Sequence, residues 1–335
     1  MRPGARSDGQ VGSVAHRVVP PGMAPLAVVG TTAAGKSALA MELARHRGDV
    51  ELVSVDSMQV YRGMDIGTAK ATLAERAEVR HHLLDVVEPW APFDVHSFQR
   101  AVTESLADIA DRGRRAVLVG GTGLYLRAVI DGFEIPGRYP AVAAELEAVS
   151  DRTEETERLH ARLRRLDPVA AERMEPTNRR RVIRALEVTL GSGRPFSSFG
   201  PGLDTHPPSP VTLVGIWLPR PVVAERIEAR YRDQLGQGFL DEVRRLAGGP
   251  PLSHTASQAL GYRELLAHLD AVDAGDPHPT LDASVDEGVR RTRRFARRQR
   301  VWFRRDPRIA WVGAADDPRV ALPALLDEAT ALWDH

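Results

Sequence analysis

Residues 25–45 read PLAVVGTTAAGKSALAMELAR. The apolar run from Pro25 to Val29 predicts a short strand, and apolar residues recur at helical spacing from Lys36 to Arg45. Between them, residues 30–37 fit the pattern GxxxxGK(S/T). Directly after a strand and directly before a helix, this pattern predicts a phosphate-binding loop.

The residue types of this loop suit a diphosphate or a triphosphate. Glycines let successive backbone amides converge on phosphate oxygens, and the N-terminus of the following helix adds positive potential. Lys36 adds a full positive charge, and the hydroxyl of Ser37 is a candidate ligand for Mg²⁺. The loop alone leaves open whether the ligand is ATP or another diphosphate ester. A chance match in an alanine- and glycine-rich turn is the competing interpretation.

The segments that follow predict an α/β fold. Short strands are expected at residues 51–55 and 116–119, with a helix over residues 95–111 between them. This alternation favours a mostly parallel sheet, here a P-loop-type sheet flanked by helices. The other core elements expected are strands at residues 211–218 and 309–312, and helices at residues 221–235, 239–247, 283–305 and 318–333.

A stretch of different character interrupts this core. Residues 134–208 contain charged amphipathic helices, such as Val142–Ser150 and Glu155–Leu166, and no convincing strand, which predicts a helical insertion domain. The expected organisation is a disordered extension at residues 1–24, the first part of the core at 25–133, the insertion at 134–208, and the second part of the core with basic C-terminal helices at 209–335.

The composition excludes several classes of protein. The 335 residues include 45 basic and 45 acidic side chains, so binding to nucleic acid requires that these charges be segregated. There is no cysteine, which excludes a disulfide framework and a thiolate metal site, and no apolar run is long enough to span a bilayer. We expect a soluble cytoplasmic protein, and a monomer by default.

Two further loops carry polar groups at the ends of predicted strands. Asp56 follows the strand at residues 51–55, and Thr122 follows the strand at residues 116–119 after two glycines. Because open α/β sheets bind ligands at the carboxyl ends of their strands, both are expected beside the phosphate loop. Asp56 would either help to hold Mg²⁺ or take a proton from an acceptor. A helix cap at Asp56 and a tight turn at the glycines are the structural alternatives.

Six blocks of sequence resemble the tRNA dimethylallyltransferase family over residues 26–312. Beyond the phosphate loop, they are SVDS at residues 54–57 with QVY at 59–61, GMDIGTAK at 63–70, HHLLD at 81–85, LVGGTGLY at 118–125, NRRRVIRALE at 178–187 and QALGYR at 258–263. Their occurrence in the expected order argues against a chance match. The resemblance implies a P-loop-type core with a helical insertion, and a channel that tRNA and the prenyl donor enter from opposite sides.

The resemblance also implies the reaction. A dimethylallyl group would pass from dimethylallyl diphosphate to the exocyclic amine of the adenosine 3′ of the anticodon, in tRNAs that read codons beginning with U. Asp56 would be the general base, Thr122 would contact the target nucleotide, and Mg²⁺ would be the cofactor. The donor diphosphate would lie on Gly30, Thr31, Thr32, Ala33, Ala34, Gly35, Lys36 and Ser37, together with Arg230. The positions matched to tRNA contacts are Asp56, Ser57, Met58, Gln59, Thr122, Arg180, Arg181, Val182, Ile183, Arg184, Gln258, Ala259, Leu260, Gly261, Tyr262 and Arg263.

The chain departs from the family pattern at three positions. Thr31 stands where a proline is usual and Ala34 where a serine is usual, and neither change removes a phosphate ligand. Ala143 stands where family members often place an arginine toward tRNA, so that contact is not carried over. The absence of cysteine also means that the zinc-finger extension of some eukaryotic relatives is absent.

Two basic clusters are candidates for RNA contact. Residues 290–305 contain nine arginines and no acid, for which a contact with an RNA backbone and a solvated helix face are the two interpretations. Arg179–Arg181 with Arg184 form a second cluster within a family block. His81 and His82 suggest a metal pair, but adjacent residues point to different sides of most backbones, so we expect a structural role or a loop contact.

Two other functions remain open from the sequence. A P-loop small-molecule kinase would explain the phosphate loop and Asp56, but it leaves the basic clusters and the other blocks unexplained, and it predicts ATP consumption without RNA. A tRNA-binding regulator without catalysis is disfavoured, because Lys36, Ser37, Asp56 and Thr122 are all present.

Overall fold

The computed structural model describes residues 18–149, 152–200, 202–203 and 205–334. Its strands are β1 (Leu26–Gly30), β2 (Val50–Val55), β3 (His81–His82), β4 (Arg115–Gly120), β5 (Thr212–Trp217) and β6 (Ile309–Gly313). Its helices are α1 (Lys36–Arg47), α2 (Leu73–Glu78), α3 (Val95–Asp111), α4 (Gly123–Ile130), α5 (Pro140–Glu147), α6 (Thr153–Leu166), α7 (Pro168–Glu172), α8 (Arg179–Ser192), α9 (Arg220–Gly236), α10 (Phe239–Ala247), α11 (His254–Ser257), α12 (Tyr262–Asp273), α13 (Leu281–Phe303) and α14 (Leu322–Asp334), with a 3-10 turn over Phe196–Phe199. None of these helices is long and apolar enough to cross a membrane.

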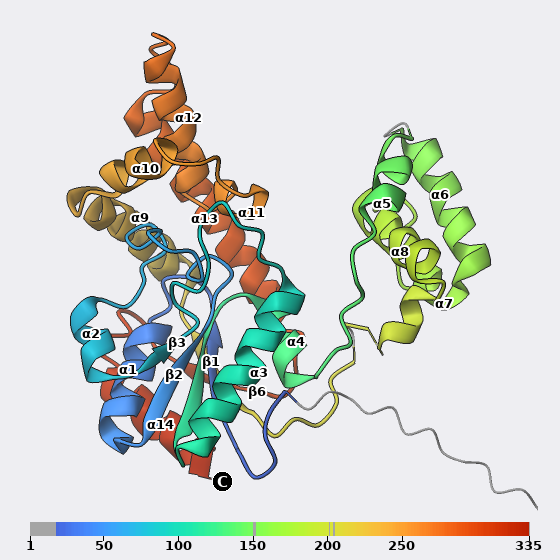
Figure 1. The fold of residues 1–335 in the computed structure, drawn as a ribbon. Helices are drawn as coiled ribbons and strands as arrows, with labels where there is room; N and C mark the ends of the chain where they lie inside the picture. The colour runs from blue at the N-terminus through green and yellow to red at the C-terminus, as the bar shows by residue number, and fades with distance from the viewer. Residues whose placement is uncertain (1–17, 150–151, 201, 204, 335) are drawn as a thin grey trace, which may run out of the picture. The chain divides into compact units, whose positions relative to one another are not determined.

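The strands form one parallel sheet in the order β3-β2-β4-β1-β5-β6 (Figure 1). From β1 the chain runs outward to β2, returns to β4, and then crosses β1 to reach β5. Strand β1 is buried along its whole length, as expected of a parallel strand that helices cover on both faces. The α/β class and the parallel sheet predicted from the sequence are confirmed.

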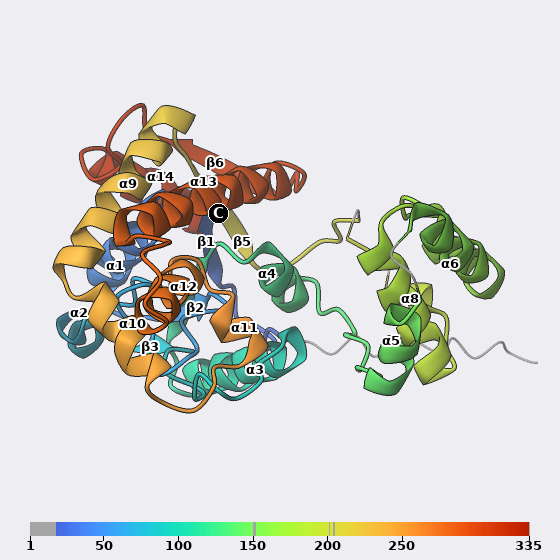
Figure 2. The same cartoon turned by 90° about the horizontal axis from the view of Figure 1, so that it is seen from above.

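Helices pack on both faces of this sheet (Figures 1 and 2). Helices α1 and α14 contact each other on one face, whereas α3 and α4 contact each other on the opposite face, where α13 also packs on β1. Helix α3 shows how the sequence directs this packing. The Asp94 carboxylate caps its first turn by accepting from the N–H of Ser97 at 2.9 Å. Its buried stripe follows helical spacing and consists of Phe98, Val102, Leu106 and Ile109.

The chain divides into two compact units. The larger unit comprises residues 18–131 together with the described residues from Thr205 onward, and it contains the sheet. The smaller unit runs from Gly132 to Asp204, whereas the sequence predicts the insertion at residues 134–208. Its described residues form α5 to α8 and the 3-10 turn, and they contain no strand. Its own hydrophobic core contains Leu146, Leu159, Leu163, Ala171, Val182, Ile183, Ala185 and Leu186.

The extension predicted over residues 1–24 lies for the most part, at residues 1–17, outside the described residues. Val18 and Val19 are buried and belong to the main hydrophobic core. The packed structure therefore includes these two apolar residues, although the predicted extension continues to residue 24.

The other predicted elements coincide with the structure within a few residues, and the differences have local causes. The prediction starts the last helix at Pro318, but α14 starts at Leu322 because a turn precedes it, in which the Asp317 carboxylate accepts from the N–H of Arg319 at 3.0 Å. The edge strand β3 is missing from the prediction because its two histidines form no apolar pattern. His82 shares a hydrogen bond of 2.7 Å with the Glu51 carboxylate of β2.

Gly120, at the end of β4, has very little space around it. A Cβ atom at this position would lie 2.0 Å from the carbonyl oxygen of Val55 on β2. We expect Gly120→Ala to push β2 and β4 apart and to lower the free energy of unfolding by about 1–3 kcal/mol, the usual range for overpacking. Denaturant-induced unfolding measures this difference.

Gly236→Ala is the matched control. Gly236 is the last residue of α9, and a Cβ atom there meets no atom within 4 Å. Alanine is intrinsically better than glycine in a helix, so this variant should be as stable as the wild type or more stable. Equal stability of Gly120→Ala and the wild type would contradict the tight packing of β2 against β4.

Candidate active site

Three loops meet at the carboxyl end of the sheet because their strands end at the same level. Val29 of β1 is paired with Gly120 of β4, and Gly120 is paired with Val55 of β2. The loops that follow these residues line a cavity of about 640 Å³ in the larger unit. The predicted site residues that line it are Thr32, Ala33, Ala34, Gly35, Lys36, Ser37, Asp56, Ser57, Met58, Gln59, Thr122, Arg230, Gln258, Ala259, Leu260 and Tyr262.

The phosphate loop depends on its two glycines. Gly30 and Gly35 have φ angles of 145° and 92°, a region that residues with a side chain rarely adopt. Gly35 is also the N-cap of α1 and offers no side-chain cap, so the first N–H groups of the helix stay available to an anion. The ammonium of Lys36 donates to the carbonyl of Thr31 at 2.8 Å, which holds the side chain against the loop.

Two cations of the cavity are poorly solvated. Burial lowers the pKa of Lys36 to about 8; the Asp56 carboxylate opposes this shift and the Arg230 guanidinium adds to it. Burial also lowers the pKa of Arg230. Because the cost of burying these charges is already part of the folded structure, an anion that enters the cavity would interact with them strongly.

Helix α9 contributes a pair of arginines to the phosphate loop. Arg230 donates to the hydroxyl of Thr32 at 3.3 Å and to the carbonyl of Gly67 at 3.3 Å. Arg226, one turn earlier, donates to the carbonyl of Ala33 at 2.8 Å and pairs with Asp317 at 2.6 Å. The sequence prediction names Arg230 and misses Arg226, although the spacing of four residues on a helix puts both on one face.

Asp56 is held in place by a local turn. One of its carboxylate oxygens accepts from the N–H of Met58 at 2.8 Å, a hydrogen bond that aspartate commonly makes to the backbone two residues ahead. The hydroxyl of Thr122 accepts from the N–H of Ser57 at 3.4 Å, which connects the loop after β4 to the loop after β2. Asp56 and Thr122 thus lie next to each other in the wall of the cavity.

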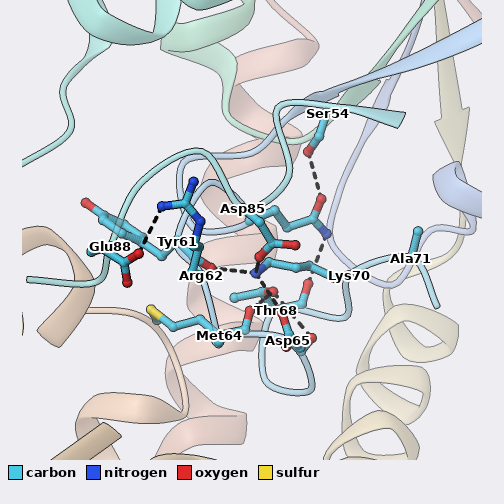
Figure 3. Close-up of polar contacts among 12 residues, drawn as sticks. Ser54, Tyr61, Arg62, Met64, Asp65, Thr68, Lys70, Ala71, Asp85 and Glu88 are labelled. Atoms are coloured by element: carbon cyan, nitrogen blue, oxygen red, sulfur yellow. Dashed lines mark hydrogen bonds and ion pairs between the residues drawn. The ribbon is translucent and has the colours of Figure 1, made fainter. Parts of the chain in front are cut away.

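A buried lysine organises the segment that follows (Figure 3). The side chain of Lys70 is 1% exposed, and its ammonium donates to the Tyr61 carbonyl at 2.5 Å, to Asp65 at 2.7 Å and to Asp85 at 2.6 Å. Burial acts to raise the pKa of Asp85, but hydrogen bonds from Lys70 and Arg76 outweigh it and leave that pKa lowered. The motif residues from 63 to 70 therefore hold a loop whose Gly67 carbonyl meets Arg230.

Only part of the segment Gln258–Arg263 is accessible. Gln258 and Arg263 are exposed and form a hydrogen bond of 2.9 Å with each other. Ala259 and Tyr262 are buried, and the Tyr262 hydroxyl donates to Glu242 at 2.6 Å. The same Glu242 carboxylate accepts from backbone N–H groups of residues 65–67, so in this structure Tyr262 supports the loop around Gly67.

The predicted tRNA-contact segment of α8 also divides into surface and core. Arg180 and Arg181 are exposed, whereas Val182 and Ile183 are buried in the core of the smaller unit. Arg184 is occupied within that unit: it pairs with Glu187 at 2.8 Å and donates to the carbonyl of residue 136 at 2.8 Å. The guanidinium groups of Arg180 and Arg181 are therefore the part of this segment open to an RNA backbone.

The arginine-rich stretch 290–305 is likewise not a uniform cationic surface. Several arginines pair within the protein: Arg290 and Arg294 with Glu287, Arg291 with Glu264, and Arg293 with Glu228. Arg300 is buried, donates to the carbonyl of Leu218 and lies 4.1 Å from the ring centre of Trp217. Arg297, Arg298 and Arg305 are exposed. Between them, Gln299 is buried and faces the phosphate loop, a position that the sequence prediction misses.

The oxygen donors near the phosphate loop are few. Within the described residues, no group of three or more His, Cys, Asp or Glu side chains could hold a metal ion. Ser37 and Asp56 line the same cavity. Such a donor set fits Mg²⁺, which usually keeps several waters and takes its other ligands from one or two protein groups and substrate phosphates. His81 and His82 make structural contacts, as expected from the sequence: Nδ1 of His81 bonds the Val79 carbonyl and Nε2 of His82 bonds the Glu51 carboxylate.

Comparisons with known proteins agree with this arrangement. The family model "IPP transferase" matches residues 59–306. The tRNA dimethylallyltransferase of Bifidobacterium animalis is 44% identical over 92% of this chain and 86% of its own length, and that of Streptomyces coelicolor is 46% identical over 91% and 95%.

Solved structures give the same result. The tRNA isopentenylpyrophosphate transferase of Bacillus halodurans superposes with a TM-score of 0.60 at 36% identity, covering 92% of this chain and 99% of that one. A eukaryotic dimethylallyltransferase acting on tRNA superposes with a TM-score of 0.71 at 25% identity, covering 90% and 77%. With a family model over most of its core and close relatives over nine tenths of its length, the chain belongs to the IPP transferase family.

Proposed function

We propose that this chain acts in the cytoplasm and transfers the dimethylallyl group of dimethylallyl diphosphate to the exocyclic amine of the adenosine 3′ of the anticodon, in tRNAs that read codons beginning with U. The observation that carries the proposal is that Lys36, Arg230, Asp56 and Thr122 line one cavity. The first two are suited to a diphosphate, and the other two are suited to an acceptor base.

The reaction needs a general base because the amine nitrogen of the acceptor adenine is a poor nucleophile. The lone pair of the adenine amine is delocalised into the ring, so loss of a proton as the new bond forms lowers the barrier. Asp56 would accept this proton, and its turn to Met58 keeps one carboxylate oxygen fixed while the proton is transferred. Thr122 would orient the nucleotide through its hydroxyl.

The donor side must stabilise a leaving group. Cleavage of the allylic carbon–oxygen bond leaves negative charge on the diphosphate, and that charge would be met by Lys36, Arg230 and the N–H groups at the start of α1. Mg²⁺, when bound by the substrate phosphates and by Ser37 or Asp56, supplies further electrostatic stabilisation of this charge. Nothing in this chemistry requires hydrolysis of ATP.

The target adenine must leave its stack to reach Asp56, which costs least in the single-stranded anticodon loop. Exposed arginines would hold the RNA backbone during this step. On the larger unit these are Arg263 and the exposed arginines of the stretch 290–305, and on the smaller unit they are Arg180 and Arg181.

An incorporation assay tests the proposal. Purified protein is incubated with Mg²⁺, labelled dimethylallyl diphosphate and unmodified tRNA without ATP, while label in RNA and released diphosphate are followed. Label on an anticodon-loop adenosine, with equal release of diphosphate, is the expected result. ATP turnover on a small acceptor without RNA labelling would instead favour a kinase.

Asp56→Asn tests the general base. Asparagine keeps a side-chain oxygen for the N–H of Met58, so the local turn should survive while the proton acceptor is removed. We expect single-turnover transfer to slow by about two to four orders of magnitude, the range for loss of a general base. Affinity for tRNA should stay within a few-fold in a filter-binding titration. An unchanged transfer rate would remove Asp56 from the reaction.

Arg181→Ala tests the RNA contact of the smaller unit. For each RNA phosphate left without its cationic partner, the slope of log affinity against log salt should become smaller by about 0.7–0.9. Arg158→Ala is the control, because Arg158 is exposed on α6 of the same unit and pairs with Glu155 at 2.6 Å. Titrations of tRNA at several salt concentrations should show the smaller slope for Arg181→Ala only. Identical slopes for both variants would make this part of α8 a solvated surface.

A further inference from the structure

We propose that Gln299 is a positioning residue of the transfer reaction. Its side-chain amide joins the phosphate loop to the loop that carries Thr122, and so fixes the distance between the donor and the acceptor. The inference rests on the proposed transfer reaction.

The amide of Gln299 makes one hydrogen bond to each loop. Its oxygen accepts from the N–H of Thr32 at 2.8 Å, and its nitrogen donates to the carbonyl of Gly121 at 3.0 Å. Thr32 lies in the phosphate loop and contacts Arg230, whereas Gly121 directly precedes Thr122. One side chain of α13 therefore connects the two loops that would hold the two substrates.

This connection has only one satisfactory orientation. With oxygen toward Thr32 and nitrogen toward Gly121, both backbone groups are paired. The reversed amide would place two donors together and two acceptors together. Gln299 is 7% exposed, so water does not replace these hydrogen bonds easily, and an unpaired partner would be left buried.

The sequence around Gly121 is adapted to the same contact. A Cβ atom at Gly121 would lie 2.3 Å from the amide nitrogen of Gln299 and 3.2 Å from the carbonyl oxygen of Gly30. The absence of a side chain at this position thus permits the approach of α13 and of β1 together. Gly121 and Gln299 form a matched pair across 178 residues of sequence.

The hydrogen bonds continue from this pair to the proposed base. The residue after Gly121 is Thr122, whose hydroxyl accepts from the N–H of Ser57, next to Asp56. A shift of the Gly121 loop would therefore displace Thr122 and the turn of Asp56 relative to Lys36. Each substrate would keep its own binding groups, but the reacting atoms would be misaligned.

Gln299→Met tests this role with little change in shape and no change in charge. Methionine can neither accept from the N–H of Thr32 nor donate to the carbonyl of Gly121. We expect the single-turnover rate to fall by about 10- to 100-fold, the scale of a misplacement of about 1 Å. The dissociation constants of dimethylallyl diphosphate and of tRNA, measured separately, should each stay within about threefold, because neither substrate loses a binding group.

Two further variants separate positioning from general destabilisation. Gln99→Met is the matched control: Gln99 of α3 donates to the Ala128 carbonyl at 2.7 Å, away from the cavity, and its variant should transfer at the wild-type rate. Thr122→Val removes the hydroxyl at the far end of the chain of hydrogen bonds. If Gln299 acts through Thr122, a variant that carries both the Gln299 and the Thr122 substitutions should be slowed by much less than the product of the slowing factors of the two single variants.

The outcomes are distinct. Active wild-type protein, a slow Gln299→Met variant, near-constant dissociation constants and a non-additive double variant would together support the positioning role. A normal rate for Gln299→Met, a loss explained entirely by weaker binding, or independent effects of Gln299 and Thr122 would overturn it while leaving the proposed function intact. Absence of transfer in the wild type would instead overturn the proposed function.

Discussion

The site depends on the level at which three parallel strands end. Val29, Gly120 and Val55 are paired across β1, β4 and β2, so the phosphate loop, the glycine loop and the turn of Asp56 leave the sheet side by side. A shift of one residue in any of these pairings would reverse the faces of a strand that is buried on both sides. Gly120 makes the arrangement tight, because only a residue without a side chain fits against the Val55 carbonyl. The chemistry of the site therefore follows from a constraint on backbone packing.

What a basic side chain of this protein can bind depends on its burial and on its partners more than on the number of charges in the chain. The chain has as many acidic as basic residues, and many arginines of the 290–305 stretch bond glutamates, backbone carbonyls or a tryptophan ring. Lys36 and Arg230 differ from them because both face the cavity and burial lowers the pKa of each. A solvated arginine attracts RNA over a distance set by salt, whereas a desolvated cation binds a phosphate strongly at contact. The two kinds of cation thus suit the two substrates.

The sequence predicts the sheet and the cavity well because the signals are local. A strand, an eight-residue motif and a helix predict the phosphate site, and Asp56 and Thr122 follow from their places after strands. Local signals do not predict which residues of a family block are exposed and which are buried. Val182 and Ile183 carry the helical spacing of a core, and Tyr262 finds Glu242 twenty residues away along the chain, so both segments mix surface residues with buried ones. Arg226 could have been found from its spacing of four residues from Arg230 on one helix, whereas Gln299 depends on partners 267 and 178 residues distant, which no periodicity reveals.

Several residues outside the predicted set of site residues share a physical task. A loop without regular secondary structure leaves backbone N–H and C=O groups that must find partners before it can hold one shape. Here single buried side chains provide them: Glu242 for the N–H groups of residues 65–67, Lys70 for the Tyr61 carbonyl, and Gln299 for Thr32 and Gly121. The predicted site residues would touch the substrates, but the positions of their loops are set by these partners. Loss of a partner should therefore slow the reaction through geometry while leaving substrate binding almost unchanged, which is the behaviour that separates a positioning residue from a ligand.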